Sequence, residues 1–399
     1  MKILQLCHRV PVPPSDGGTL AMYNLTKGFI ANGIDVQILA LNTLKHFIDT
    51  KDLLINSKPI APLDAVTVDT SANARDALRY IFSNNSYNIV RFYSAEFDEK
   101  LKEILSAKEF NLIQLESLFM VPYLETIRKY STAKVVLRSH NVEFKIWERM
   151  TALAPFGFKK AYFKHLTDRL KNYEISHLNS YDMLVAITEE DADFFKSSGC
   201  NIPIAVAPFA VAIDDYKMNS TAVETHSLFH LGSMDWMPNI EAMKWFLETV
   251  WKKIHKKFPD LKFYIAGRNM PDEFKNLKLK NVEVIEDVND AKKFISSKQI
   301  MVVPLQTGSG MRVKIIEGMA LGKTVISTSI GAEGIDSTHL KNILIANTPD
   351  EYIYWIEKCL LDKTLSETIG SNAKSLIETT YDNKIISKNL IQLYQNICN

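Results

Sequence analysis

The residues best suited to chemistry lie in one short stretch, a loop followed by the start of a helix. Gly308, Ser309 and Gly310 form a glycine-rich loop, and Arg312 and Lys314 follow it directly. The apolar spacing that begins here predicts a helix, which puts both cations in its first turn. The helix dipole disfavours a cation at that place by roughly 0.3–1 kcal/mol. An anion bound by the loop N–H groups would account for both cations, and phosphate is the usual anion at such a helix start.

Two buried strands are expected on either side of this loop and helix. The apolar residues 300–303 predict a strand that Pro304 ends, because proline cannot donate a ladder hydrogen bond. Helical spacing runs from Met311 to a stop near Gly322, and residues 324–327 predict the next strand. The unit is strand, loop, helix, strand.

Glu317 falls on the same helix, one turn after Val313 and towards its buried side. A buried carboxylate is costly without a partner, so Glu317 is expected to accept hydrogen bonds, for which ribose hydroxyls are suitable donors. In the alternative interpretation both cations point into solvent, and Lys314 pairs with Glu317 three residues further on.

The stretch from Gly308 to Ile326 resembles the donor-nucleotide motif of the retaining glycosyltransferases of family four, which have the GT-B fold. In most members the motif has two glutamates. Glu317 matches the second, which binds the ribose of the nucleotide, whereas Ser309 stands in place of the first, which touches the donor sugar. The resemblance therefore implies that Ser309, or the backbone from Gly308 to Met311, contacts the sugar. A glycine-serine-glycine loop is familiar in envelope-polysaccharide members of this family.

A glycine pair, Gly17 and Gly18, follows the first predicted strand, residues 3–6, and precedes a helix that ends near Gly33. The open N–H groups of this helix are expected to face outward at the carboxyl edge of the sheet, where doubly wound sheets bind ligands. A lone glycine pair is more often an ordinary turn. The resemblance implies a role, since the family uses such a pair to let the backbone approach donor and acceptor.

His140 is the candidate for positioning the donor sugar. It comes directly after the predicted strand of residues 134–137. A lone histidine is more often structural than catalytic, but the family places a histidine after this strand, near the reacting centre. Asn141 and Glu143 are weaker candidates for the same site.

The second half of the chain repeats the strand, loop and helix pattern. Gly232 and Ser233 follow the strand of residues 228–231, and the resemblance places this loop against the donor diphosphate. Asp235 and Trp236 could equally shape the loop without touching ligand.

Arg268 follows the next predicted strand, residues 263–266. An arginine suits phosphate because its planar fork binds two oxygens. The family uses one arginine and one lysine for the diphosphate, and Arg268, Arg312 and Lys314 are three candidates for these two roles. Val288 lies in a loop that, in relatives, brackets the nucleobase, largely through backbone, so the sequence does not identify the base.

The predicted fold is α/β of the GT-B type, with two Rossmann-like doubly wound domains that face a central cleft. We expect residues 1–208 to form an N-terminal acceptor domain and residues 209–381 a C-terminal domain for the nucleotide-sugar donor. The final helix, about residues 382–399, is expected to cross back onto the first domain.

Composition excludes several classes of protein. The net charge of +1 gives no bulk attraction to nucleic acid. The four cysteines lack a metal-type or disulfide spacing, which favours a reducing, cytoplasmic location. No apolar run is long enough for a spanning helix. A basic, aromatic-rich helical pattern over residues 158–180 could contact the cytoplasmic face of the inner membrane.

The expected reaction is transfer of a sugar from a nucleotide-diphosphate sugar to a glycan or lipid-linked acceptor, with retention and without a metal or other cofactor. The expected role is in the synthesis of cell-surface polysaccharide or lipopolysaccharide. Neither a glycosidase-like carboxylate pair nor the aspartate-any-aspartate motif of metal-dependent transferases is evident. The alternatives are a nucleotide-sugar 2-epimerase or phosphorylase of GT-B type, or a non-catalytic sugar-nucleotide-binding subunit. A NAD enzyme is disfavoured because Gly-x-Gly-x-x-Gly is missing.

Overall fold

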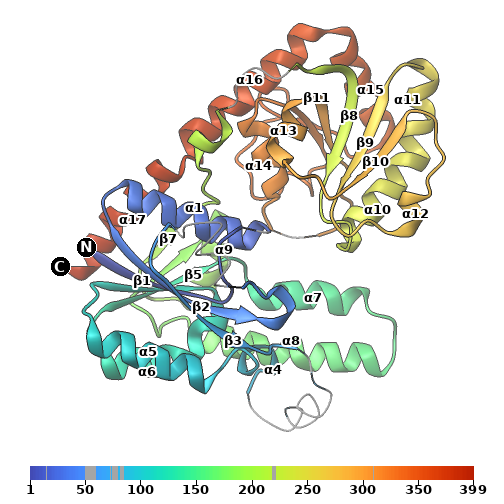
Figure 1. The fold of residues 1–399 in the computed structure, drawn as a ribbon. Helices are drawn as coiled ribbons and strands as arrows, with labels where there is room; N and C mark the ends of the chain where they lie inside the picture. Colours follow the sequence, from blue (N-terminus) through green and yellow to red (C-terminus); the bar gives the residue numbers. More distant parts are fainter. Residues whose placement is uncertain are drawn as a thin grey trace. The chain divides into compact units, whose positions relative to one another are not determined.

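The computed structural model describes residues 1–14, 16–49, 60–71, 73, 80, 85–217, 222–308 and 310–399, so the predicted site residue Ser309 lies outside the described part of the chain. It has two compact units: Met1–Ala210 with Asn383–Asn399, and Val211–Asp382. Each unit is built on a parallel sheet with helices on both faces (Figure 1). The predicted α/β class with two Rossmann-like sheets is therefore confirmed.

The first unit contains a seven-stranded sheet in its described part, in the order β3-β2-β1-β4-β5-β6-β7. Its strands are β1 (Lys2–Cys7), β2 (Asp35–Thr43), β3 (Leu63–Val68), β4 (Leu112–Glu116), β5 (Lys134–Ser139), β6 (Met183–Ala186) and β7 (Ile204–Val206). Its helices are α1 (Gly17–Ala31), α4 (Tyr87–Val90), α5 (Ala95–Ala107), α6 (Leu124–Tyr130), α7 (Glu143–Leu153), α8 (Phe158–Ser176), α9 (Glu189–Ser197) and α17 (Asn383–Cys398).

The two faces of this sheet have separate cores. Leu4, Leu6 and their neighbours pack against α5 to α9 on one face, whereas Ile3 and Cys7 pack against α1 and α17 on the other. A parallel sheet covered on both faces is normally apolar throughout. The α1 face departs from this rule at the centre of the sheet, where four polar side chains are fully buried: Gln5, Gln114, Glu116 and Arg138.

Helix α17 packs along α1 within the first unit. Gly28 of α1 is close to α17, because a Cβ there would lie 2.4 Å from the main-chain oxygen of Asn383. The Asn383 amide donates to the oxygen of Asn24 at 3.0 Å, and the Tyr394 hydroxyl donates to Gln114 Oε1 at 2.7 Å. The last helix thereby completes the core of the first unit.

The second unit has a six-stranded sheet in its described part, in the order β10-β9-β8-β11-β12-β13. Its strands are β8 (Glu224–Leu231), β9 (Lys262–Gly267), β10 (Val282–Glu286), β11 (Lys298–Val303), β12 (Thr324–Ser327) and β13 (Leu344–Ile345). Its helices are α10 (Met237–Phe246), α11 (Lys252–Lys257), α12 (Asp272–Lys275), α13 (Ala291–Ser296), α14 (Val313–Ala320), α15 (Pro349–Leu361) and α16 (Lys363–Thr380).

Each sheet has one switch point, where the strand order reverses. In the first unit it lies between β1 and β4, and in the second between β8 and β11. Loops leave the carboxyl ends of these strand pairs in opposite directions, which opens a crevice for ligands. These two places are therefore where functional residues are expected.

Several details differ from the sequence expectations. Strand β3 was not predicted, because its residues lack a clear apolar period. The apolar spacing of residues 240–254 predicts one continuous helix, but the structure has a π-helical turn at Leu247–Trp251. The long basic helix ends at Ser176, short of the predicted Ser180. Among the described residues, no helix combines the length and apolar character needed to cross a bilayer.

Candidate functional site

Two glycines shape the backbone at the switch point of the second unit. Gly232 follows β8, and Gly267 ends the neighbouring β9 with φ of +154°. A Cβ on Gly267 would lie 1.7 Å from the oxygen of Gly232, and a Cβ on Gly232 would lie 2.6 Å from Lys314 Nζ. No other residue fits either position without movement, so the Lys314 ammonium lies directly against the backbone.

Lys314 reaches from α14 to two polar groups of the β8 region. Its Nζ donates to Asn239 Oδ1 at 2.7 Å and lies 3.2 Å from Nε2 of the fully buried His230. His230 Nδ1 is 2.9 Å from the oxygen of Val302, which can only accept, so Nδ1 carries the hydrogen and Nε2 accepts from Lys314. The Lys314 ammonium is thus held by two neutral acceptors.

The charge at this point is not balanced from within. Burial, together with the neighbouring Arg312, lowers the pKa of Lys314 to about 7. Burial and Lys314 also lower the pKa of His230, so the imidazole is neutral. No carboxylate of the described residues forms an ion pair with Lys314, which contacts the neutral groups of Asn239 and His230. An anion bound here would supply the missing countercharge.

Arg312 is the N-cap residue of α14, so the expectation that it lies in the first helical turn is wrong. The helix begins one residue later, because Arg312 adopts an extended backbone conformation. Its side chain donates to the oxygen of Gly310 and lies 5.3 Å from the centre of the Trp236 ring. Gly308 and Gly310 both have positive φ, +120° and +80°. Arg312 and Lys314 therefore lie on the same helix start, as the anion-site interpretation requires.

Glu317 is bonded to a residue that the sequence did not single out. The hydroxyl of Tyr216, from the 3₁₀ turn Ile213–Tyr216, donates to Glu317 Oε1 at 2.8 Å. Burial raises the pKa of Glu317, while Tyr216 and Lys292 oppose the rise. The Lys292 ammonium lies 4.5 Å from the centre of the Tyr216 ring. The alternative pairing of Lys314 with Glu317 is not formed.

The remaining predicted residues of the second unit lie in the loops that follow its strands. Arg268 is exposed just after β9, and its main-chain oxygen accepts from Met234 N at 2.8 Å. Ser233 Oγ donates to Asp235 Oδ1 at 2.6 Å, so both side chains shape the loop after β8. Val288 is half-buried between β10 and α13, and Met311 is half-buried just before Arg312.

The position of the glycine pair in the first unit differs from the expected one. Gly17 and Gly18 are the first two residues of α1, not residues before it. Asp16 caps the helix, accepting from Gly18 N at 2.9 Å and Thr19 N at 3.1 Å, and it pairs with Arg9 at 2.6 Å. The expected open N–H groups at this helix start are therefore closed by a carboxylate.

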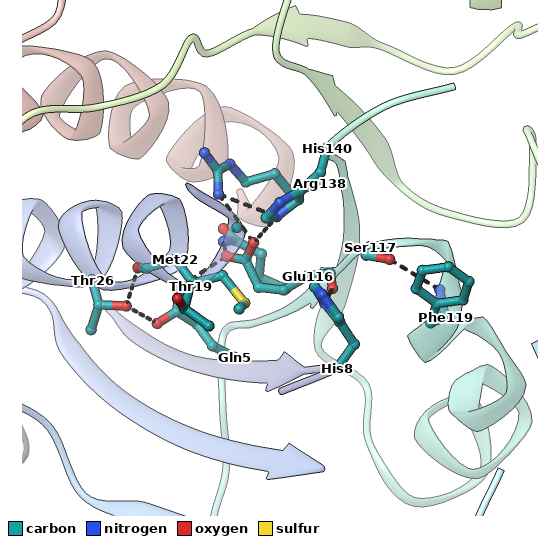
Figure 2. Close-up of polar contacts among 12 residues, drawn as sticks. Gln5, His8, Thr19, Met22, Thr26, Glu116, Ser117, Phe119, Arg138 and His140 are labelled. Carbon is teal, nitrogen blue, oxygen red and sulfur yellow. Dashed lines mark hydrogen bonds and ion pairs between the residues drawn. The ribbon is translucent and has the colours of Figure 1, made fainter. Parts of the chain in front are cut away.

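His140 lies at the switch point of the first unit and contacts a carboxylate that the sequence interpretation missed. Its Nε2 is 2.7 Å from Oε2 of Glu116, the last residue of β4 (Figure 2). Glu116 and Arg138 are direct partners in the register of β4 and β5, and Arg138 Nη1 donates to Glu116 Oε2 at 3.1 Å. Gln5 and Gln114 donate to the other oxygen, Oε1. Glu116 therefore organises the polar centre of the sheet.

The electrostatics of this polar centre are balanced internally. Burial alone would raise the pKa of Glu116, but Arg138 and His140 outweigh it and the pKa falls to about 2. Burial lowers the pKa of His140, although its hydrogen bond to Glu116 opposes the shift. Glu116 is thus an ionised carboxylate beside a guanidinium and a neutral imidazole.

Asn141 and Glu143 lead into α7. Glu143 is buried near Glu174 of α8, and burial together with Glu174 raises the pKa of Glu143 to about 8. Glu174 accepts from the main-chain N of Glu143 at 3.0 Å and of Phe144 at 3.1 Å. These two main-chain hydrogen bonds to Glu174 fix the start of α7, the helix that follows His140.

Sequence reasoning missed several residues at the two switch points: His8, Glu116, Arg138, Tyr216, His230 and Asn239. A signal was present for two of them, because Glu116 and Arg138 are charged residues at the ends of two predicted buried strands. Charged groups are almost never fully buried unless paired, so such a pattern indicates a pair. Nothing local marks Tyr216, which lies just after the expected domain boundary at residue 208.

Comparisons with known proteins agree with this geometry. Residues 225–362 match the family model of the glycosyl transferases group 1. The chain is 25% identical over 412 residues to an uncharacterized 44.6 kDa protein in the cps region of Klebsiella pneumoniae, covering 98% of this chain and 99% of that protein.

Solved structures share the fold over nearly the whole chain. A crystal structure of HepE from Anabaena in complex with UDP has a TM-score of 0.69 at 14% identity, covering 99% of this chain and 100% of that chain. Sucrose-phosphate synthase of Thermosynechococcus elongatus has a TM-score of 0.68 at 13% identity, covering 100% and 99%.

Two Rossmann-like units and the similarity to these solved structures define a fold of the GT-B type. Residues 225–362, which include the motif from Gly308 to Ile326, are similar to the glycosyl transferases group 1, in agreement with the resemblance that the motif shows.

Proposed function

We propose that this protein transfers a sugar from a nucleotide-diphosphate sugar to a glycan or lipid-linked acceptor, with retention of the anomeric configuration. The observation that carries the proposal is the half-buried Lys314 ammonium, which has neutral partners and a pKa lowered to about 7. Such a group is costly in the empty protein. It is stabilised when a doubly charged diphosphate binds beside it.

The diphosphate is proposed to lie at the start of α14. Arg312 and Lys314 supply positive charge there, Arg268 is exposed at the end of the neighbouring strand, and Gly232 and Ser233 provide a close backbone. As the sugar leaves the diphosphate, negative charge grows on the leaving group, and preorganised cations stabilise it. The leaving diphosphate accepts the proton of the attacking acceptor hydroxyl.

The nucleoside is proposed to lie between Glu317, which accepts from the ribose hydroxyls, and the loop at Val288. HepE from Anabaena has been solved with UDP, and with UDP-glucose, which makes uridine nucleotides the first candidates. The donor sugar would contact His140 and the loop of Gly308, Ser309, Gly310 and Met311. For Gly17 and Gly18 we keep the role that the family resemblance implies, a close approach of the backbone to donor and acceptor. Residues 1–208 with the last helix would bind the acceptor, and residues 209–381 the donor.

We also propose that the reaction needs no metal, because protein cations neutralise the diphosphate. Retention and metal independence are tested together. The anomeric proton of the product, followed by NMR, reports the stereochemistry, and transfer in the presence of EDTA reports the metal requirement. An inverted product would refute retention, and loss of activity that Mg²⁺ restores would refute metal independence.

The donor site itself is tested by a thermal-shift panel of nucleoside diphosphates and their sugar conjugates. Binding raises stability by RT ln(1 + [L]/Kd), about 2.7 kcal/mol at a hundredfold excess over Kd. A shift with one base, lost in Glu317→Ala and Arg312→Ala, is expected. Nucleotide-sugar alone distinguishes an epimerase, since that reaction needs no acceptor. No shift with any nucleotide would refute the donor site.

A role in cell-surface polysaccharide synthesis is proposed from the relative in the Klebsiella cps region, whose name refers to capsular polysaccharide. Such acceptors are assembled at the cytoplasmic face of the inner membrane. The connection between α7 and α8 offers a contact: Phe156 and Phe158 are 100% and 98% exposed, and Lys159 and Lys160 follow. Exposed phenylalanines beside lysines suit an anionic bilayer surface.

The membrane proposal is tested by sedimentation with anionic vesicles at low salt. Wild-type protein is expected to pellet, and a Phe156→Ser/Phe158→Ser variant to remain largely in solution. Ile385→Ser, which changes an exposed apolar residue of α17, serves as the control. Equal pelleting of all three proteins, or of none, would refute the contact.

A further inference from the structure

Glu116 contacts two histidines, one through its side chain and one through its backbone. His8, which follows β1, has its Nδ1 2.8 Å from the main-chain oxygen of Glu116. A carbonyl oxygen can only accept a hydrogen bond, so the His8 hydrogen is on Nδ1. The tautomer of His8 is therefore set by the end of β4.

His140 has the opposite arrangement. Its Nε2 lies 2.7 Å from Glu116 Oε2, and this carboxylate is ionised because Arg138 and His140 hold the Glu116 pKa at about 2. An ionised carboxylate only accepts, so the His140 hydrogen is on Nε2. The 3.5 Å approach of Arg138 Nη1 to the same nitrogen is then a contact between two donors, not a hydrogen bond.

Both rings are neutral. Burial, followed by Arg9 and His140, lowers the pKa of His8 to about 3. Burial, with Arg138 and Arg9 in support, lowers the pKa of His140, against the opposing effect of Glu116. Each ring therefore keeps one nitrogen with a free lone pair: Nε2 of His8 and Nδ1 of His140. Neither nitrogen has a hydrogen-bond partner among the residues that the structure describes.

The surroundings of the two rings resemble a binding site more than a core. The rings are perpendicular with centres 5.9 Å apart, and they lie at the switch point where β1 and β4 end (Figure 2). The half-buried Phe119 ring lies 5.9 Å from His8. Ser117, directly after Glu116, has φ of +96°, a conformation that costs a non-glycine residue energy and that occurs more often at functional sites than elsewhere.

We propose that Glu116 is a positioning residue that holds His8 and His140 in opposite neutral tautomers, so that His8 Nε2 and His140 Nδ1 accept hydrogen bonds from hydroxyl groups of a sugar substrate. The inference rests on the proposed glycosyl transfer and adds His8 and Glu116 to it. A fully ionised phosphate has only acceptor oxygens and cannot donate to either lone pair. The site therefore selects hydroxyl groups, of the donor sugar or of the acceptor sugar.

The tautomers are measured directly, without substrate. In protein labelled with ¹⁵N-histidine, long-range ¹H–¹⁵N NMR correlations distinguish Nδ1–H from Nε2–H, and His8→Asn and His140→Gln assign the two spin systems. The expected result is Nδ1–H for His8 and Nε2–H for His140, both neutral at neutral pH. The reverse tautomer in either ring, or a protonated ring, would overturn the proposal.

A second measurement tests Glu116 as the cause. Glu116→Gln replaces the carboxylate with an amide that can donate or accept. We expect His140 to become a mixture of tautomers, while His8, bonded to the main chain, keeps Nδ1–H. An unchanged, single His140 tautomer in a folded variant would refute the positioning role. If this variant does not fold, the tautomers of the wild type still decide.

Two pairs of variants distinguish the effect of the free lone pairs from the effect of the hydrogen bonds to Glu116. His8→Asn and His140→Gln each retain an N–H near the position that bonds Glu116 and remove the free acceptor. His8→Gln and His140→Asn do the reverse, placing an amide oxygen near the free nitrogen. Loss of function is expected in the first pair, about fivefold to tenfold for one neutral hydrogen bond. The second pair should recover part of it.

The affinities of the variants for UDP, GDP and ADP are compared with their affinities for the glucose conjugates of these nucleotides. If the donor sugar is the ligand, the first pair of variants lowers the affinity for the nucleotide-sugar but not for the nucleoside diphosphate. If the acceptor sugar is the ligand, both affinities stay and KM for a saccharide acceptor rises. No change in either would overturn the proposal. Failure of every nucleotide to bind wild-type protein would instead refute the donor site, and the NMR result would still stand.

Discussion

The two switch points occupy equivalent places in the two sheets, yet their charges are arranged in opposite ways. In the first unit, Arg138 has its own anion, Glu116, on the neighbouring strand. In the second unit, Lys314 contacts His230 and Asn239, both neutral, and pairs with no carboxylate in the part of the chain that the structure describes. A buried charge without a countercharge destabilises the empty protein, whereas a paired one becomes a liability only when its partner is removed.

The first switch point therefore suits neutral ligand groups, whereas the second suits an anion. The polar centre around Glu116 is complete in its charges and leaves hydrogen-bond acceptors free. At the start of α14, the Lys314 ammonium lies beside neutral groups, so a bound anion would supply its countercharge. Mutations at the two places should therefore differ in the sign of their effect on stability, and the following experiments test that difference.

The largest effect is expected for Glu116→Ala. It leaves the Arg138 guanidinium buried without a countercharge, which costs about 3–5 kcal/mol. Trp147 is the only tryptophan of the first unit, so ¹⁹F NMR of 5-fluorotryptophan protein in urea follows that unit separately. Glu116→Ala/Arg138→Met should regain part of the loss. Wild-type stability in the single variant would show that the pair is not needed.

Lys314→Gln should act in the opposite direction. Removing the uncompensated charge is expected to raise the melting temperature of the empty protein while lowering nucleotide affinity about tenfold to a hundredfold, the value of a hydrogen bond to a charged group. Isothermal titration with UDP and a thermal melt measure both.

Lys323 provides the matched control for this experiment. It is a more deeply buried lysine of the same unit and donates to the main-chain oxygens of Ser296 and Lys298 at 2.7 and 2.8 Å. Lys323→Gln should destabilise the protein and leave nucleotide affinity unchanged. If Lys314→Gln behaved like Lys323→Gln, Lys314 would be a structural residue.

Falling pH should lower the stability of the first unit through His8 at its switch point. Its pKa is about 3 in the folded protein, against 6.5 for an ordinary histidine, so the unfolded chain takes up a proton first. Stability is therefore lost as pH falls from 6.5 towards 3, by up to about 1.4 kcal/mol per pH unit. His8→Asn should lose less stability than wild type over this range.

The difference between wild type and His8→Asn isolates this effect from Glu143. The raised pKa of Glu143 acts in the other direction, since its contribution is lost as pH rises through about 8. Urea midpoints read at Trp147 across the pH range provide the comparison. Parallel curves for the two proteins would mean that His8 does not titrate as proposed.

The smallest effect is expected at the ribose. Tyr216→Phe removes the donor to Glu317 and should weaken UDP binding by about twofold to tenfold, the range for one neutral hydrogen bond. Inorganic pyrophosphate is the control ligand, because it lacks a ribose and should bind both proteins equally. An equal loss for pyrophosphate would place the effect of Tyr216 at the phosphates instead.

The sequence predicted the second switch point better than the first, for a physical reason. The residues from Gly308 to Glu317 are adjacent in the chain, so a glycine loop, two cations and a helix period can be recognised together. Glu116, His8 and Arg138 come together only through the register of three strands. Tyr216 meets Glu317 across 101 residues. Such contacts depend on topology, which local spacing does not encode.

The return of α17 to the first unit sets the order in which the chain can be finished on the ribosome. The sheet residue Gln114 is synthesised 280 residues before its partner Tyr394. Residues 211–382, by contrast, form a continuous unit that can fold as soon as it emerges. The apolar face under α17 therefore stays uncovered until residues 383–398 have been synthesised.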